Sequence, residues 1–175
     1  RAYNIPPDRI ETGSFLILGA IAAKKLEITD CLPKELTVPI EILRQSGVKI
    51  KTTKNTITVS SDNISKNRKL KAVTVKTHEY PGFPTDLQAP MTVYLTQVFG
   101  DSLVFETIFE GRLGYTEDLV RMGANIIPLD THRVMVKGPT PLRGRELESP
   151  DLRAGLAFLI AAIVAKGESV LNNVH

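Results

Sequence analysis

Three stretches of this chain open in the same way, with a proline and an aspartate before a long apolar segment that has helical spacing. The aspartates are Asp8, Asp86 and Asp151. After each of the first two, the pattern predicts the same order of elements: helix, strand, helix, strand, strand. A glycine closes the second helix of each copy, Gly47 in one and Gly123 in the other. The chain is therefore predicted to be an internally repeated structure of helices and strands.

We expect one domain over residues 1–175, with repeats at about 1–69 and about 70–137 and a partial third repeat at about 142–175. A unit of this size cannot bury both of its faces alone, so the units should pack around shared helices in a quasi-threefold arrangement. The first helix of each copy is apolar nearly all round, which predicts burial at the centre. The predicted fold class is α/β (α+β), built from βαβαββ units.

The periodicity also sets the expected boundaries of the individual elements. The helices are expected near residues 8–23, 35–45, 86–99, 116–122 and 151–165, and the strands near 26–29, 48–51, 56–59, 70–76, 102–107, 125–128, 133–136, 142–147 and 169–174. The polar and charged residues 60–69 are expected to form an exposed loop.

Charge and composition exclude some classes of function. The net charge is +3 and the basic residues are scattered, which argues against a dedicated nucleic-acid binder. The longest apolar run covers residues 154–165, well short of the ~20 residues that span a bilayer, so no membrane association is expected. A single cysteine, Cys31, fits a reducing, cytoplasmic compartment. Both ends of the chain look abrupt, so we expect it to be a piece of a longer protein.

The approach to the second copy's helix is more constrained than a simple connector requires. Pro81 and Pro84 fix their own φ angles, and Gly82 between them permits a tight bend. This turn delivers Asp86 to the start of the helix. Either Thr85 or Asp86 is predicted to cap that helix, because a side-chain oxygen there can accept from its first N–H groups.

Four motifs carry a resemblance to a known family. They are Pro7-Asp8-Arg9-Ile10-Glu11-Thr12-Gly13, Pro81-Gly82-Phe83-Pro84-Thr85-Asp86-Leu87-Gln88-Ala89, Arg121-Met122-Gly123-Ala124 and Asp151-Leu152-Arg153-Ala154. In this order and spacing, across essentially the whole chain, they resemble the UDP-N-acetylglucosamine enolpyruvyl transferases of bacterial peptidoglycan synthesis. The related shikimate-pathway enolpyruvyl transferases match the Asp86 turn less well.

The resemblance implies an inside-out α/β barrel-like domain and a second domain of the same protein, with the active site between them. The implied reaction transfers enolpyruvate from phosphoenolpyruvate to the sugar hydroxyl of UDP-N-acetylglucosamine and releases phosphate. It implies no metal or organic cofactor. The implied partners are these two substrates and the second domain, with no nucleic acid and no membrane.

The resemblance also assigns roles to three residues of the second copy. Asp86 resembles the catalytic aspartate that contacts the sugar hydroxyl, as a base or as the last relay of its proton. A helix N-terminus favours a charged carboxylate, so positioning should matter as much as proton transfer. Arg112 matches a catalytic arginine near the enolpyruvyl and phosphate site, although the family commonly has an amide where Gly111 stands. Ile108 matches a position that binds the UDP-sugar, and its backbone groups are expected to act.

The helix entries of the first and third copies are weaker candidates for substrate-binding sites. Asp151 and Arg153 resemble the family's Asp-Leu-Arg turn near the active site and are candidate substrate-binding residues, with an N-cap and a salt bridge as the alternative. Asp8, Arg9 and Glu11 are interpreted as structural, with a capping box that also braces the hinge between domains.

The family's reactive cysteine lies on a Gly-rich loop of the other domain, and Cys31 lacks that context. A phosphoenolpyruvate-contacting lysine and a further arginine of the family have no counterpart here, so we expect this chain alone to be inactive. The alternative is a non-catalytic ligand-binding or RNA-binding module of repeated βαβ units. The tyrosines form no stacking platform with the basic residues, which argues against RNA.

Overall fold

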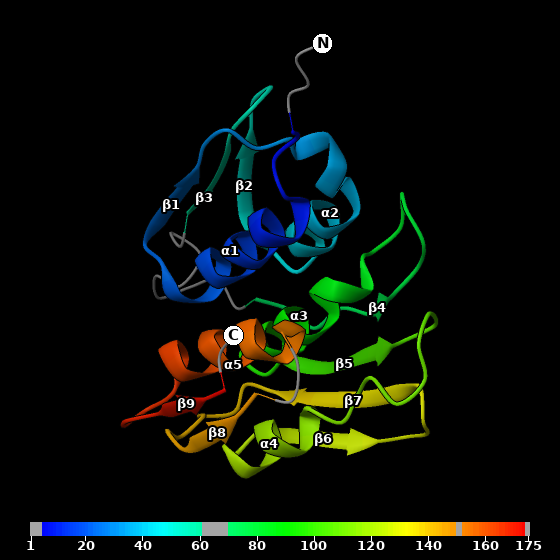
Figure 1. Ribbon diagram of the computed structural model, residues 1–175, viewed down its shortest axis with the longest axis vertical. Coiled ribbons are helices and arrows are strands. Elements are labelled where there is room, and N and C mark those ends of the chain that lie inside the picture. The colour runs from blue at the N-terminus through cyan, green and yellow to red at the C-terminus, as the bar shows by residue number, and fades with distance from the viewer. Residues whose placement is uncertain (1–4, 61–69, 150–151, 174–175) are drawn as a thin grey trace.

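The structure, a computed structural model, describes residues 5–60, 70–149 and 152–173, with the backbone alone at residues 152 and 153. Its elements fall into three groups along the chain (Figure 1). The first group contains α1 (Arg9–Ala22), β1 (Lys25–Ile28), the 3-10 helix η1 (Pro33–Leu36), α2 (Thr37–Gln45), β2 (Lys49–Thr52) and β3 (Ile57–Ser60). Its sheet has the order β1-β3-β2, and both pairings are antiparallel.

The second group has a larger sheet. It contains β4 (Val75–Lys76), the 3-10 helix η2 (Thr85–Leu87), α3 (Gln88–Leu95), β5 (Gly100–Phe105), α4 (Thr116–Arg121), β6 (Asn125–Pro128) and β7 (Arg133–Gly138). The strand order is β4-β5-β7-β6, in which β4 and β5 are parallel and the other pairs are antiparallel. The third group contains β8 (Glu146–Glu148), α5 (Leu152–Val164) and β9 (Val170–Asn172), with β8 and β9 parallel.

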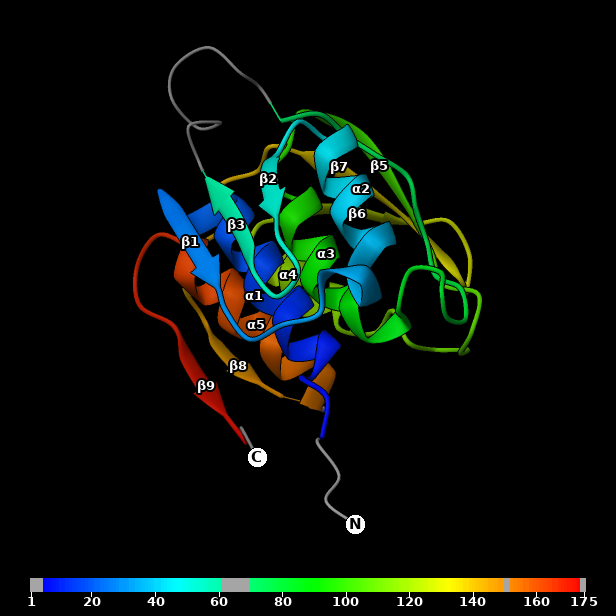
Figure 2. The ribbon, with the colours of Figure 1, turned by 90° about the horizontal axis from the view of Figure 1, so that it is seen from above.

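Helices α1, α3 and α5 pack on one another between the two larger sheets (Figures 1 and 2). Every residue of α3 is buried, as its apolar sequence predicts. The other two helices differ from that expectation, because Phe15 on α1 and Leu159 and Ile163 on α5 are about half exposed. The buried helices surrounded by sheets agree with the predicted fold class, an α/β domain of inside-out barrel type.

Several local predictions are confirmed. Asp8 caps α1, because its carboxylate accepts from the N–H groups of Ile10 at 2.7 Å and Glu11 at 3.3 Å. Gly47 and Gly123 have φ angles of +105° and +107° just after α2 and α4, a conformation that glycine adopts without a steric penalty. Both predicted hairpins form, one between β2 and β3 and the other between β6 and β7.

The predicted cap at the start of the second copy is wrong. Pro84 precedes η2 and Leu87 precedes α3, and neither helix has a side-chain cap. The hydroxyl of Thr85 instead donates to Glu106, which lies beyond β5 in sequence. A tertiary hydrogen bond has therefore displaced the local one.

Some element boundaries also differ from the prediction. The helix expected near residues 86–99 ends at Leu95, and the carbonyl of Thr96 just beyond it accepts from the N–H of Thr140 at 2.8 Å. The strands expected at 70–76 and 142–147 shorten to β4 and β8. The loop expected at 60–69 lies almost wholly outside the described residues. Within the described part of the chain, no helix is long and apolar enough to cross a membrane.

Candidate active site

The candidate site lies on the two loops that follow β4 and β5. These strands are parallel, with Val75 opposite Val104 and Lys76 opposite Phe105. Their carboxyl ends therefore reach the same edge of the sheet, the place where open α/β sheets commonly bind ligands. The loop after β4 leads to Asp86, and the loop after β5 carries Ile108 and Arg112 (Figure 1).

The first loop makes the tight bend that the sequence predicts. The N–H of Gly82 donates to the carbonyl of Glu79 at 2.7 Å, and the N–H of His78 donates to the carbonyl of Phe83 at 3.0 Å. A Cβ atom at Gly82 would lie 2.5 Å from the Cβ of His78, which explains why glycine occupies this position. Phe83 is buried, so the turn is anchored in the core and its far side carries Asp86.

Asp86 and Arg112, to which the family resemblance assigns catalytic roles, lie together. Oδ1 of Asp86 is 3.4 Å from Nη2 of Arg112, and their side chains are 36% and 13% exposed. Nη1 of Arg112 donates to the hydroxyl of Thr85. The guanidinium carbon lies 4.3 Å from the centre of the Phe109 ring, which is the geometry of a cation–π contact. The arginine is thus held on three sides.

Beneath this pair lies a fully buried carboxylate, Glu106. Its Oε1 accepts from the Thr77 hydroxyl at 3.0 Å, the Ile108 N–H at 2.8 Å and the Phe109 N–H at 3.2 Å. Its Oε2 accepts from the Thr85 hydroxyl at 2.8 Å. The sequence analysis did not identify Glu106. One sequence feature could have indicated it: Glu106 lies at the end of a predicted strand and shares its buried face with Ser102 and Val104.

The second loop places Ile108 at the candidate site, but its backbone N–H already has a hydrogen-bond partner. Its N–H donates to Glu106, so a contact with a ligand from this residue would use its carbonyl or its half-buried side chain. Asp151 lies outside the described residues. Arg153 belongs to α5, and its side chain lies outside the described part.

Gly111 stands where the resembled family commonly has an amide residue, and its backbone conformation suits both residue types. Its φ angle is +67°, in the left-handed region. Asparagine is among the residues that enter this region most readily after glycine. No atom lies within 4 Å of a Cβ built there. Glycine and an amide residue therefore both suit the turn that carries Arg112.

Residues of the first copy contact the turn that precedes Asp86. The guanidinium of Arg9 lies 5.1 Å from the centre of the Tyr80 ring. A hydrogen bond with Glu35 raises the pKa of the Tyr80 hydroxyl. Arg9, next to the Asp8 cap of α1, therefore also connects the first group of elements to the turn that leads to Asp86.

Cys31 is buried, and its thiol contacts the carbonyls of Ile28 at 3.5 Å and Asn55 at 3.6 Å. Burial raises the pKa of this thiol. A thiol with a raised pKa is a poor nucleophile at neutral pH. The structure thus gives Cys31 the features of a structural residue, in agreement with its lack of the family's Gly-rich loop.

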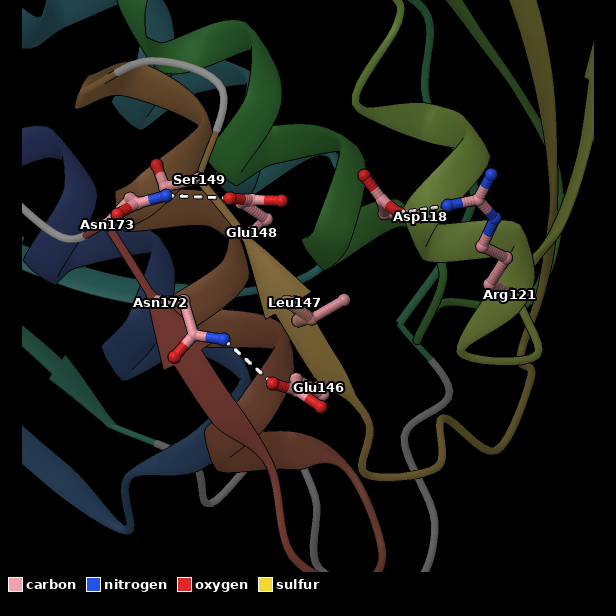
Figure 3. A pocket seen from close by; sticks show the side chains of 8 residues that line it. All are labelled: Asp118, Arg121, Glu146, Leu147, Glu148, Ser149, Asn172 and Asn173. Atoms are coloured by element: carbon pink, nitrogen blue, oxygen red, sulfur yellow. Dashed lines mark hydrogen bonds and ion pairs between the residues drawn. The ribbon is translucent and has the colours of Figure 1, made fainter.

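A separate polar hollow of about 660 Å³ lies between α4 and the β8–β9 pair (Figure 3). Its carboxylates already have partners. Glu146 accepts from Asn172 at 2.9 Å, Glu148 accepts from Asn173 at 2.7 Å, and Asp118 pairs with Arg121 at 3.0 Å. Across the described ranges, no group of three or more His, Cys, Asp or Glu is placed to hold a metal ion.

The geometry of Asp86 and Arg112 places an acceptor for a hydroxyl proton beside a group that binds anions. A family model described as EPSP synthase (3-phosphoshikimate 1-carboxyvinyltransferase) matches residues 1–175. The chain belongs to this family. Membership of the EPSP synthase family confirms the resemblance to enolpyruvyl transferases.

Two curated relatives share one name. The UDP-N-acetylglucosamine 1-carboxyvinyltransferases of Koribacter versatilis and Halothermothrix orenii are 41% and 43% identical to this chain over 173 residues. These alignments cover 99% of this chain and 39% and 40% of the relatives. The chain therefore spans about two fifths of the length of these curated relatives.

Solved structures of enolpyruvyl transferases share the fold. The enolpyruvyl transferase NikO from Streptomyces tendae matches with a TM-score of 0.85 and 25% identity, covering 99% of this chain and 40% of that one. The EPSP synthase of Acinetobacter baumannii matches with a TM-score of 0.73 and 18% identity, covering 97% of this chain and 39% of that one. The second match supports the fold alone.

Proposed function

We propose that this chain supplies part of the active site of a UDP-N-acetylglucosamine 1-carboxyvinyltransferase. The observation that carries the proposal is the pairing of Asp86 with Arg112 at 3.4 Å on adjacent loops. The relatives with that name, at 41% and 43% identity, support the choice of substrates over 3-phosphoshikimate. They also favour an enzyme over a non-catalytic binding module.

The proposed chemistry has two stages. The sugar hydroxyl adds through its oxygen to C2 of the enolpyruvyl group of phosphoenolpyruvate, while C3 takes up a proton. Loss of a proton from C3 and of phosphate from C2 then restores the double bond. Asp86 would accept the hydroxyl proton or hold the hydroxyl in place. Arg112 would bind the carboxylate or phosphate of phosphoenolpyruvate, since a guanidinium suits both.

The remaining assignments follow from the same proposal. The three groups of elements support repeats at about 1–69, 70–137 and 142–175, because β4–β5 and β8–β9 are both parallel pairs with a helix of the central layer between them in sequence. A second domain of the same protein would supply the reactive cysteine and close over the substrates. The enolpyruvyl transfer would take place in the cytoplasm, as a step of peptidoglycan synthesis.

The test is an assay of the protein encoded by the whole reading frame that contains this chain. We expect phosphate release only when phosphoenolpyruvate and UDP-N-acetylglucosamine are both present. Asp86→Ala should lower kcat by about 100-fold, the typical contribution of a positioned acid or base. The matched control is Asp101→Ala, an exposed aspartate at the other end of β5 that should leave kcat unchanged.

A folded product of that reading frame that consumes neither substrate would overturn the proposed function. The 175-residue chain should not release phosphate by itself. Weak binding of the UDP-sugar to this chain can be followed by saturation-transfer NMR, and Asp86→Ala should abolish it.

A further inference from the structure

Among the residues that the structure describes, Glu106 is the one charged side chain that is fully buried, and the proposed chemistry does not use it. Its side chain is fully buried, and an ionised carboxylate in such a place destabilises the fold unless hydrogen bonds replace its water. The four hydrogen bonds it accepts come from both loops of the site. These hydrogen bonds tie Thr85 of the first loop and the backbone of Ile108 and Phe109 in the second loop to one carboxylate.

The chemistry of the carboxylate fixes the direction of a hydrogen-bonded chain. An ionised carboxylate can only accept, so the single hydroxyl proton of Thr85 points to Oε2 of Glu106 at 2.8 Å. The lone pairs of the same hydroxyl then face Arg112, whose Nη1 donates to them. The polarity therefore runs from Arg112 through Thr85 to Glu106.

This chain determines where the other end of the guanidinium lies. Because the guanidinium is planar and rigid, fixing Nη1 on Thr85 and the ring face on Phe109 also fixes Nη2, which lies 3.4 Å from Asp86. The same carboxylate also holds the N–H of Phe109, the residue whose ring covers the guanidinium. Glu106 thus supports two of the three contacts of Arg112.

We propose that Glu106 is a positioning residue that, through Thr85 and the backbone of Phe109, sets the guanidinium of Arg112 against Asp86 before substrate binds. The catalytic part of this inference rests on the proposed function, whereas the placement of Arg112 can be tested without it. A group held in its productive geometry beforehand does not have to be ordered during the reaction.

Glu106→Gln separates this role from a simple structural one. The amide is nearly isosteric and can still accept from Thr77, Ile108 and Phe109 through its oxygen. Its nitrogen would then face Thr85 as a donor, so the hydroxyl proton would turn toward Arg112, where two donors oppose each other. Thr85→Val removes the hydroxyl altogether, and Thr85→Ser restores it.

The first measurement is ¹⁵N NMR of the Arg112 side chain in the 175-residue protein. We expect separately resolved Nη1 and Nη2 signals in the wild type, because each terminal nitrogen has its own partner. The signals should merge in Glu106→Gln and Thr85→Val and stay separate in Thr85→Ser. The matched control is Tyr94→Phe, which removes a different buried hydrogen bond, to Ser46, and should leave the signals unchanged.

The second measurement is kinetic, on the protein encoded by the whole reading frame. Glu106→Gln and Thr85→Val should lower kcat about 10- to 100-fold, as a displaced catalytic group does. Thr85→Ser should recover most of that loss, and Tyr94→Phe should match the wild type despite its lower stability. If Glu106→Gln does not fold, the Thr85→Val and Thr85→Ser pair decides the question.

The two proposals fail in different ways. A wild-type protein that releases no phosphate contradicts the proposed function, while the NMR signals still decide the placement of Arg112. An active wild type whose Glu106→Gln and Thr85→Val variants keep both the kcat and the resolved signals overturns the positioning role alone.

Discussion

Asp86 and Arg112 face each other across two adjacent loops, with 3.4 Å between Oδ1 and Nη2. Each residue follows a different strand of one parallel pair, and because β4 and β5 run in the same direction their two loops lie at the same edge of the sheet. Arg112 is the more deeply buried of the two, and its partners Thr85 and Phe109 hold its plane. The side chain of Asp86 is about a third exposed, so a ligand can reach it.

Arg112→Lys retains the positive charge, but we expect it to lower kcat/KM strongly. An ammonium cannot contact Thr85 and Asp86 and also lie flat on Phe109. We expect kcat/KM for phosphoenolpyruvate to fall about 10- to 100-fold in the full-length protein, as follows from losing a hydrogen bond to a charged group. Steady-state phosphate release measures this.

The control for that substitution is Arg121→Lys. Arg121 is largely exposed and pairs with Asp118 on α4, an interaction that contributes little to stability. Its kcat/KM should match the wild type. If both lysine variants behave alike, the fork geometry of Arg112 is not needed.

Gly111 provides a test of the turn that carries Arg112. At a φ of +67°, Gly111→Ala should lower the free energy of unfolding by about 1 kcal/mol. Gly111→Asn should cost clearly less, because asparagine tolerates the left-handed region. Urea denaturation of the 175-residue protein gives both values. Equal losses for the two variants would mean that the backbone conformation is not what selects glycine here.

Asp8 has the capping role that Asp86 lacks. Asp8→Ala should lower the free energy of unfolding by about 0.5–2 kcal/mol, because two N–H groups of α1 lose their acceptor. Asp8→Ser keeps an oxygen at the cap and should retain most of the stability. Thermal or urea denaturation distinguishes the two. A serine variant as unstable as the alanine variant would argue against a capping role.

Sequence patterns predict this structure correctly where the determining interactions are local. The cap at Asp8 and the left-handed glycines at Gly47 and Gly123 depend only on neighbouring residues, and the repeated pattern predicts the fold class. The candidate pair of Asp86 and Arg112 came from motifs. Their contact depends on the parallel pairing of β4 and β5, which the structure shows.

Sequence patterns mislead where segments distant in the chain compete for the same group. Thr85 had the composition of a helix cap, but a buried carboxylate beyond β5 binds its hydroxyl more favourably than the helix does. Glu106 itself could not be found from the pattern. Its donors at Thr77, Thr85 and Ile108 come from separate segments, and only the folded chain brings them to one point.

A buried tyrosine, Tyr94, should make the folded state less stable at alkaline pH. Tyr94 is fully buried and donates to Ser46 at 2.7 Å, and burial raises the pKa of its hydroxyl from 10.0 to about 12. In the unfolded chain this tyrosine loses its proton near its ordinary pKa, whereas the folded chain keeps the proton. The stability linked to Tyr94 is therefore fully present below about pH 10 and is lost as the pH rises toward 12.

Tyr94→Phe should reveal this dependence. At pH 7 the variant should lose about 0.5–1.5 kcal/mol, the usual contribution of one hydrogen bond. Between pH 10 and 12 its stability should fall less steeply than that of the wild type. Some slope should remain, because burial also raises the pKa of Tyr115. Urea denaturation from neutral to alkaline pH measures both effects, and identical slopes for the two proteins would contradict the assignment to Tyr94.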